Sequence, residues 1–389
     1  MPDQKDLDGA ADIFSWNRWL LSKLGLWPAE KSDFRFGLSF GYFMYHMTME
    51  YLDLFLFIDD LEHVIMNLTE NMAFSQIVVR MLMLRVYNFE LGEVVSEAMT
   101  DLDIRKYKTE EEKEMVIQYN SRSKTFVKLL MANVALTATS YYFQPILGQI
   151  GSLIGPADNS TFVLQLPYRF YCFYKVDEVQ SYMWTYFSQF PFVFVSGFGQ
   201  SAADCLMVTL VYHVSGQLSV LAQRISNLTV DSRTCTGEIK TVIKDHIRLL
   251  RMGTKIQEAF SITLLAHLIG ATSLVCILGY QILMNFANGE TAILGTFVAF
   301  IFLVLLVLYA HCTVGECLIT ESEKVCDAFY DCEWYCMSTN NAKIIMLCME
   351  RSQKPLRLTA GKFSMFCLAT LTEVLKTSMG YLSVLRNFL

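Results

Sequence analysis

Seven long apolar segments constrain the fold of this chain more than any other feature of its sequence. A helix needs roughly 20 mostly apolar residues to cross a bilayer, and each of these segments is at least that long. Glu62, His63 and Arg80 make the second segment the least apolar. The predicted membrane spans are residues 36–58, 62–87, 127–154, 180–215, 259–284, 292–318 and 363–388.

The composition agrees with a protein whose main solvent is lipid. Charged residues make up 18% of the chain, whereas soluble domains average about 25%. The net charge of −7 is spread along the chain, and no basic patch in the sequence indicates a nucleic-acid partner. We therefore predict an all-α bundle of seven transmembrane helices in contact with membrane lipid. The first 33 residues lack the apolar core of a removable signal peptide, so the first span is expected to direct insertion.

Lysine and arginine set the predicted orientation, because they accumulate in cytosolic loops. They are frequent before the first span and in the loops that follow the second, fourth and sixth spans. The opposite loops offer only Arg169 and Lys175. This asymmetry predicts a cytosolic N-terminus and an extracellular C-terminus, the reverse of a G-protein-coupled receptor. Asn159 begins an Asn-Ser-Thr sequon in the longest predicted external loop and is a glycosylation candidate.

Helical periodicity continues beyond the membrane-length segments. From Tyr182 to Leu228 apolar residues recur with helical spacing, interrupted only by Pro191. A helix of about 45 residues would be roughly 65 Å long, about twice the hydrocarbon core. Residues 240–260 lead into the fifth span with the same pattern. We expect helices four to six to extend, with residues 319–353, into a cytosolic anchor bundle, and residues 91–125 to form a solvated helical loop.

The cysteines and other reactive side chains give no sign of a cofactor or of catalysis. Of eleven cysteines, only Cys172 falls in a predicted external loop, so no disulfide framework is expected. The His311-Cys312 pair and the cysteines at 326, 332 and 336 lack the spacing of a closed zinc site, so we expect no metal. The sequence contains no phosphate loop, nucleophile elbow or paired catalytic carboxylates, which leaves an enzyme without support.

The last apolar segment, TEVLKTSMGYLSVLRNFL at 372–389, carries an unusual number of polar groups. At 100° per residue, one stripe of this helix gathers Glu373, Lys376, Thr377, Gly380, Val384 and Asn387, with Leu375 and Met379 on the opposite side. A charge that faces lipid costs a few kcal/mol, so the stripe must face protein or water. Packing within the subunit and a water-filled path are both open. Lys376 is expected to pair with Glu373 at i,i+3.

Several motifs in the last 64 residues resemble the C-terminal signature of insect odorant receptors. They are Tyr330 and Trp334 in CDAFYDCEWYC, the MERSQKPL run at 349–356, Ala360-Gly361, and Lys376-Thr377-Ser378 followed by Tyr381. The loop LPYRFYCFYKVDE at 166–178 is also similar, with Tyr-Cys-Phe in place of the family's Trp-Tyr-Pro. Met379-Gly380 stands where many members have Tyr-Ser, a departure that bears on the pore lining. The family's co-receptor is longer, so the chain resembles an odour-tuning subunit.

The resemblance implies a ligand-gated, non-selective cation channel that works as a heterotetramer with the shared co-receptor. Its location would be the plasma membrane of olfactory sensory neuron dendrites. The last helix would line the pore, with Val384 at a narrow hydrophobic gate of the kind that closes by dewetting. Tyr330 and Trp334 would lie at the subunit contacts. The implied pore and gate residues are Glu373, Thr377, Gly380, Val384, Asn387 and Phe388.

A volatile small-molecule ligand needs a mostly apolar cavity with a few polar contacts. Family members place this cavity in the outer half of the bundle, and aromatic residues at 141–143 and 184–192 gather at one depth of this chain. Pro191 interrupts the fourth span there, which can open space between helices. The candidate ligand-binding residues are Ala73, Phe74, Ile77, Thr139, Tyr142, Phe143, Tyr186, Gln189, Phe190, Val193, Thr272, Ser273, Cys276, Phe297 and Phe300.

Asp204 is a carboxylate inside the fourth span, and such groups are functional candidates by default. We favour a structural role in which it meets a hydroxyl or basic partner between helices. Rival function classes fit the sequence less well. A secondary transporter predicts matching halves with interrupted helices, which the sequence lacks. A receptor with a separate effector would not need the polar stripe, and a gustatory relative differs in the KTSMGYL signature.

These expectations divide the chain into four parts. Residues 1–35 form a cytosolic N-terminal segment, and residues 36–318 hold the first six spans with the outer ligand pocket and the extended helices. Residues 319–362 are the cytosolic anchor region, and residues 363–389 form the pore-lining seventh helix.

Overall fold

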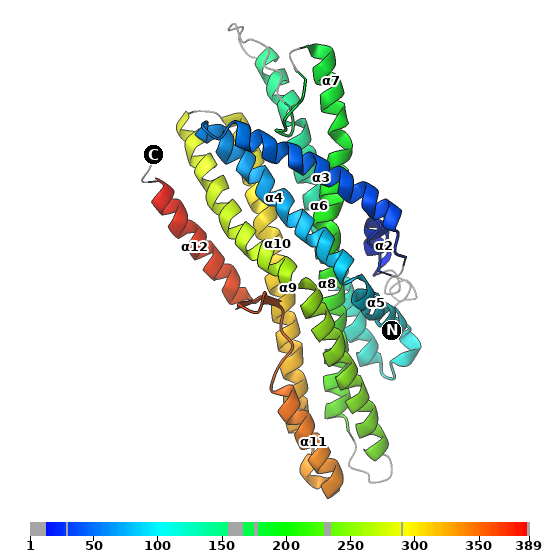
Figure 1. Cartoon of the computed structure of the whole chain (residues 1–389). Coiled ribbons are helices and arrows are strands. Elements are labelled where there is room, and N and C mark those ends of the chain that lie inside the picture. Colours follow the sequence, from blue (N-terminus) through cyan, green and yellow to red (C-terminus); the bar gives the residue numbers. More distant parts are fainter. Residues whose placement is uncertain are drawn as a thin grey trace.

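The computed structural model describes residues 13–28, 30–154, 166–174, 178–228, 235–288 and 291–386. They form an elongated bundle of long helices (Figure 1). The helices are α2 (Ser15–Lys23), α3 (Asp33–Leu56), α4 (Leu61–Val86), α5 (Asn88–Asp101), α6 (Glu110–Ile154), α7 (Val179–Ser188), α8 (Phe190–Ser226), α9 (Cys235–Asn288), α10 (Thr291–Asp331), α11 (Thr339–Ser352) and α12 (Leu368–Arg386). Short 3-10 turns lie at Ile104–Lys106 and Trp334–Cys336, and an antiparallel pair joins β1 (Thr359–Ala360) to β2 (Ser364–Met365).

Every predicted span falls largely on helix. Within the described residues, three helical stretches are long and apolar enough to cross a membrane by length and composition: Val179–Ser226, Thr236–Phe286 and Leu294–Cys336. The helices at the other four predicted spans, α3, α4, α6 and α12, carry more polar and charged residues. The number of crossings and their orientation therefore remain predictions.

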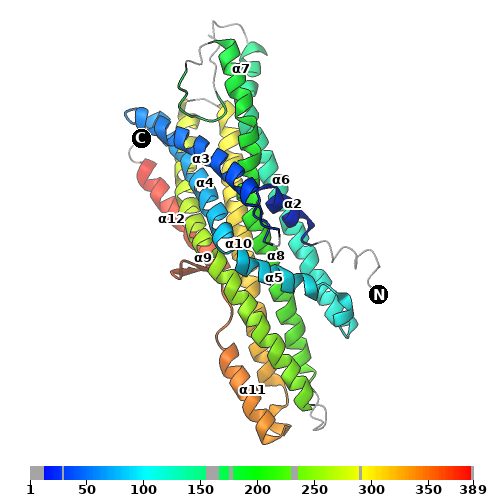
Figure 2. The same cartoon turned by 45° about the vertical axis from the view of Figure 1, so that its right-hand side comes forward.

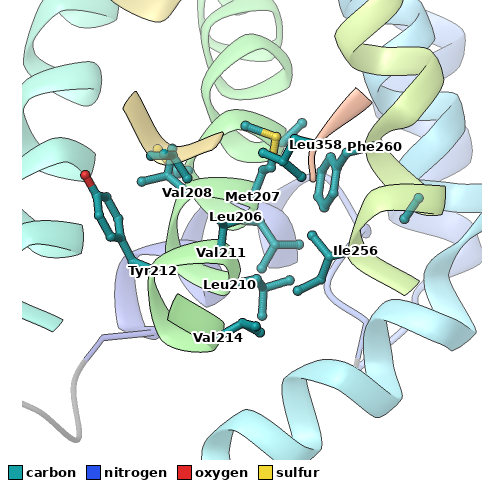
Figure 3. Packing of buried hydrophobic residues seen from close by; sticks show 14 of the residues in the cluster. Leu206, Met207, Val208, Leu210, Val211, Tyr212, Val214, Ile256, Phe260 and Leu358 are labelled. Atoms are coloured by element: carbon teal, nitrogen blue, oxygen red, sulfur yellow. The ribbon is translucent and has the colours of Figure 1, made fainter. Parts of the chain in front are cut away.

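Helix α8 is the centre of the molecule. Its residues 201–218 are all buried, because α4, α6, α9 and α10 pack around it. A helix that is mostly apolar on every face is stable when it is enclosed by other helices or by lipid, and here helices enclose it. Figure 3 shows the middle of this core, where Leu206 and Leu210 of α8 lie near Ile256 and Phe260 of α9 and Leu358 of the segment before β1.

The long helices α8, α9 and α10 continue to the end of the molecule where α11 lies (Figure 2). Helix α9 has 54 residues, which corresponds to roughly 80 Å at 1.5 Å per residue. The predicted length of these helices is thus present, and their place in a cytosolic anchor bundle stays a prediction. The continuous helix expected from Tyr182 is interrupted at Gln189, which follows α7 and caps α8.

Residues 91–125 are largely helical, as predicted, but α5 is not solvated on all sides. Helix α5 buries Leu91, Val94, Val95 and Ala98 against α8 and α9. These positions follow the i, i+3, i+4, i+7 spacing of an amphipathic helix. Glu93 is exposed on α5, whereas Asp101 at its end is buried. From Glu110, the long helix α6 then runs beside α8 along the bundle.

Helix α12 lies along α9 and α10 on one side of the bundle (Figure 1). A tight turn with positive φ at Gly361 and Lys362 joins β1 to β2 ahead of it. The entry to α12 passes so close to α10 that a Cβ atom at Gly315 would lie 2.1 Å from the Phe366 carbonyl oxygen. Further along, Leu382 packs against Gly279 of α9.

Candidate functional site

A cavity of about 130 Å³ lies between α4, α6, α8, α9 and α10. Its wall is mostly apolar, and Tyr168, from the segment before α7, also contributes to it. The lining residues are Glu70, Ala73, Phe74, Gln76, Ile77, Val134, Thr137, Ala138, Tyr141, Tyr168, Ser196, Gly197, Gln200, His267, Ala271, Leu274, Phe300, Leu303, Val304 and Val307. An apolar cavity with a few polar groups is the usual form of a small-molecule site.

Four of the predicted pocket residues line this cavity: Ala73, Phe74, Ile77 and Phe300. Two other predicted pocket residues, Tyr142 and Tyr186, do not line the cavity but bond to each other. The Tyr142 hydroxyl donates to the Tyr186 carbonyl oxygen at 3.0 Å, and the Tyr186 hydroxyl donates to the Tyr142 carbonyl oxygen at 2.5 Å. This reciprocal pair ties α6 to α7.

The buried side chain of Gln189 fixes the lining residue Tyr168. Its amide Nε2 donates to the Tyr168 carbonyl oxygen, and its Oε1 accepts from the Tyr168 backbone N–H, both at 3.2 Å. The remaining candidates of this region lie apart from the cavity wall. Val193 is half-buried, and Thr139, Phe143 and Phe190 are exposed or nearly so.

The candidates on α9 and α10 lie on the side of the cavity toward α12. Thr272 follows the lining residue Ala271, and its carbonyl oxygen accepts a hydrogen bond from the Ser378 hydroxyl of α12 at 3.3 Å. Ser273 is half-buried, and Cys276 is buried one turn further along α9. Phe297 belongs to a buried cluster with Ala271, Leu274, Leu278 and Val304. Of these residues, Thr272 connects the cavity wall to the last helix.

A buried ionic cluster lies at one end of the cavity. The Arg80 Nε atom of α4 is 3.3 Å from an Asp204 carboxylate oxygen of α8. Arg80 Nη2 lies 3.2 Å from Nδ1 of His267 on α9, and Nε2 of His311 on α10 lies 3.2 Å from Asp204. Gln200 also donates to Asp204 at 3.5 Å. The predicted basic partner for Asp204 is confirmed.

The roles of Arg80, His267 and His311 in this cluster were not predicted from the sequence. A signal was available, because two opposite charges in different apolar spans seldom stay unpaired. Gln200 and His267 belong both to the cluster and to the cavity wall. The cluster therefore forms the polar floor of a cavity whose wall is otherwise mostly apolar.

A second polar group lies at the Glu70 side of the cavity. Glu70 accepts from the Tyr141 hydroxyl and, at 3.3 Å, from the Arg169 backbone N–H. Asp53 accepts from Asn67 at 2.8 Å and lies 2.6 Å from His63 Nε2. No group of His, Cys, Asp or Glu side chains within the described ranges has the arrangement of a metal site.

Helix α12 packs through a narrow face that contains Val374 and Ser378. The polar stripe predicted for this helix does not pack within the subunit, because its members in the described range, Glu373, Lys376, Thr377, Gly380 and Val384, are all exposed. In this part of the chain Glu373 and Lys376 are both exposed, and the predicted ion pair between them is not formed. Leu375 and Met379 form a separate exposed apolar flank.

The remaining predicted residues lie elsewhere. Tyr330 is 71% exposed near the end of α10, and Trp334 is half-buried against the core beside α11. Asn159, Asn387 and Phe388 lie outside the described residues.

Comparisons with known proteins agree with this architecture. The sequence model of the 7tm odorant receptor family matches residues 60–379. Odorant receptor 13a of Drosophila melanogaster is 29% identical over an alignment of 209 residues, and the match covers 48% of each chain. The odorant receptor coreceptor of Harpegnathos saltator is 26% identical over 147 residues, covering 38% of this chain and 30% of that protein. The alignment to the first of these relatives spans about half of its length.

The fold also matches a solved structure. The olfactory receptor OR5 of Machilis hrabei, in its complex with eugenol, superposes with a TM-score of 0.78. The match covers 97% of this chain and 100% of that one at 14% sequence identity. This chain belongs to the 7tm odorant receptor family, a family of multi-pass membrane proteins.

Proposed function

We propose that this chain is the odour-tuning subunit of a ligand-gated, non-selective cation channel. It assembles with the family's co-receptor as a heterotetramer in the plasma membrane, at the dendrite of an olfactory sensory neuron. The tuning role is favoured because the match to odorant receptor 13a extends over more residues, at higher identity, than the match to a co-receptor. With seven spans, the N-terminus lies in the cytosol and the C-terminus outside.

The observation that carries the channel proposal is the exposed polar stripe of α12. A flank that holds Glu373, Lys376 and Thr377 is too costly to leave in lipid, and it finds no cover within the described part of its own chain. Facing a central axis shared with other subunits, it contacts water and forms a cation path. Leu375 and Met379, on the separate apolar flank, then face lipid or a neighbouring subunit.

The cavity supplies the ligand site of this proposal. It lies among the second to sixth predicted spans and is walled mainly by apolar side chains, as a volatile ligand requires. Ala271 of α9 belongs to this wall, and the carbonyl oxygen of the next residue, Thr272, accepts from the Ser378 hydroxyl of α12. A ligand that displaces α9 therefore moves α12, and Val384 leaves the axis. The ligand opens the channel only if it binds the open state better than the closed state.

Whole-cell recording tests this function. Cells that express the chain with and without the co-receptor are challenged with a broad panel of volatiles. We expect inward cation current only in the co-expressing cells. Current from this chain alone would remove the requirement for a partner. Silence in both cell types, with the protein present at the surface, would argue against a conducting receptor.

A further inference from the structure

The hydrogen-bonding state of His267 follows from its partner. A guanidinium has only donors, so the contact at 3.2 Å between Arg80 Nη2 and His267 Nδ1 requires Nδ1 to accept. A neutral imidazole that accepts at Nδ1 carries its proton on Nε2. The Arg80–Asp204 pair thereby fixes the tautomer of a residue that lines the cavity.

The Nε2–H of His267 is a buried donor that lacks an acceptor. His267 is 3% exposed, and Nε2 has no hydrogen-bond partner within the described ranges. Among the described residues of the cavity wall, no other has a fully buried side-chain N or O atom without a hydrogen-bond partner. Ser196, for example, donates its hydroxyl to the Val193 carbonyl oxygen at 3.1 Å. Buried donors normally find a partner, and because His267 lines the cavity, a molecule bound there can supply one.

We infer that the ligand of this cavity carries a hydrogen-bond acceptor, such as a carbonyl, ester or ether oxygen, that binds Nε2–H of His267. This inference rests on the proposed function, because it names the chemical class that the odorant site recognises. The apolar wall holds the hydrocarbon part of the ligand, and His267 orients its oxygen toward the floor. His267 is thus the specificity-determining residue of the site.

The first test compares matched ligands on the wild-type chain with the co-receptor. The probes are methyl ketones of increasing chain length and the alkenes in which a CH₂ group replaces the carbonyl oxygen, so shape and apolar surface are nearly equal. One hydrogen bond corresponds to roughly a 3- to 10-fold lower half-maximal concentration for the ketone. Equal potency of ketone and alkene across the series would overturn the inference.

Variants then locate the recognition at His267. His267→Asn keeps an acceptor for Arg80 but is too short to reach the ligand, so the ketone-to-alkene ratio should fall to about one. His267→Gln keeps both an acceptor and a distal donor and should preserve the ratio. Ser201→Ala is the control: its hydroxyl donates to the Gly197 carbonyl oxygen within α8 at 2.6 Å, and it does not line the cavity, so the ratio should stay unchanged.

The outcomes separate this inference from the proposed function. If volatiles evoke current but His267→Asn retains the ketone preference, the inference fails and the channel proposal stands. If no volatile evokes current from the wild type at the surface, the proposed function itself fails. Should a variant not reach the surface, the wild-type ligand comparison still decides, since a preference supports the inference and its absence contradicts it.

Discussion

Arg80 of α4 and Asp204 of α8 form an ion pair at 3.3 Å with 0% and 4% of their side chains exposed. Both charges lie within predicted membrane spans, where neither water nor lipid can compensate an unpaired charge. Such a pair adds little to stability compared with apolar residues of similar size, but breaking it leaves an isolated buried charge. The pair therefore makes the packing of α4 against α8 dependent on both partners.

Replacing one partner of this ion pair should destabilise the protein far more than replacing both. We expect Arg80→Leu to cost about 3–5 kcal/mol and to abolish delivery to the cell surface, measured by labelling an epitope tag. The double variant Arg80→Leu with Asp204→Leu should recover a large part of that signal. Arg251→Ala, which breaks the 2.5 Å surface pair with Glu97, is the control and should cost about 0–1 kcal/mol. Equal loss in the single and double variants would contradict this account.

A side chain at Gly315 should disturb the entry to α12. Its Cβ would lie 2.1 Å from the Phe366 carbonyl oxygen, and a backbone atom cannot move aside cheaply. We expect Gly315→Ala to cost roughly 1–3 kcal/mol, seen as a lower thermal midpoint of the detergent-solubilised protein. Gly295→Ala on the same helix meets no atom within 4 Å and should be neutral or slightly stabilising. Similar midpoints for the two variants would show that the close approach is unimportant.

The apolar runs in the sequence predicted the helices well, because each run is a local pattern. The polar cavity floor could not be predicted in this way. Arg80 and Asp204 are 124 residues apart, and Arg80 and His267 are 187 residues apart, so only the packing of the helices brings them together. The burial of α5 was a local signal that we missed, since Leu91, Val94, Val95 and Ala98 have helical spacing. Which flank of α12 packs inward also depends on tertiary contacts, here the bond between Ser378 and Thr272.

The two exposed flanks of α12 should differ in their access to water. Val384 and Met379 are 55% and 62% exposed in the single chain, but our proposal places Val384 in the pore and Met379 toward lipid or a neighbour. A charged, water-soluble thiol reagent should therefore reduce the odour-evoked current of Val384→Cys and leave that of Met379→Cys unchanged. Wild-type channels treated in the same way account for the native cysteines. Modification of Met379→Cys alone would place the opposite flank in the pore.

The stability of the α11 end should depend on pH through His246. This residue of α9 is buried and packs with its ring 5.5 Å from that of Phe329. Burial, with a smaller contribution from the Arg351 charge, lowers the pKa of His246 to about 4. Because its ordinary pKa is 6.5, the unfolded chain takes up a proton between these values and the folded chain does not. Stability is therefore lost as the pH falls from about 6.5 toward 4.

The change that isolates this effect is His246→Gln. We expect the wild type to lose roughly 1–2 kcal/mol more than the variant between about pH 7 and pH 5, measured as thermal midpoints in detergent. Asp101 does not interfere in this range. Burial would raise its pKa, but bonds from His213 and Arg248 outweigh burial and lower that pKa below 3.8. The stabilisation that follows from the lowered pKa of Asp101 is present above pH 3.8 and is lost only below that pH. Parallel pH profiles for wild type and variant would rule out His246 as the source of acid sensitivity.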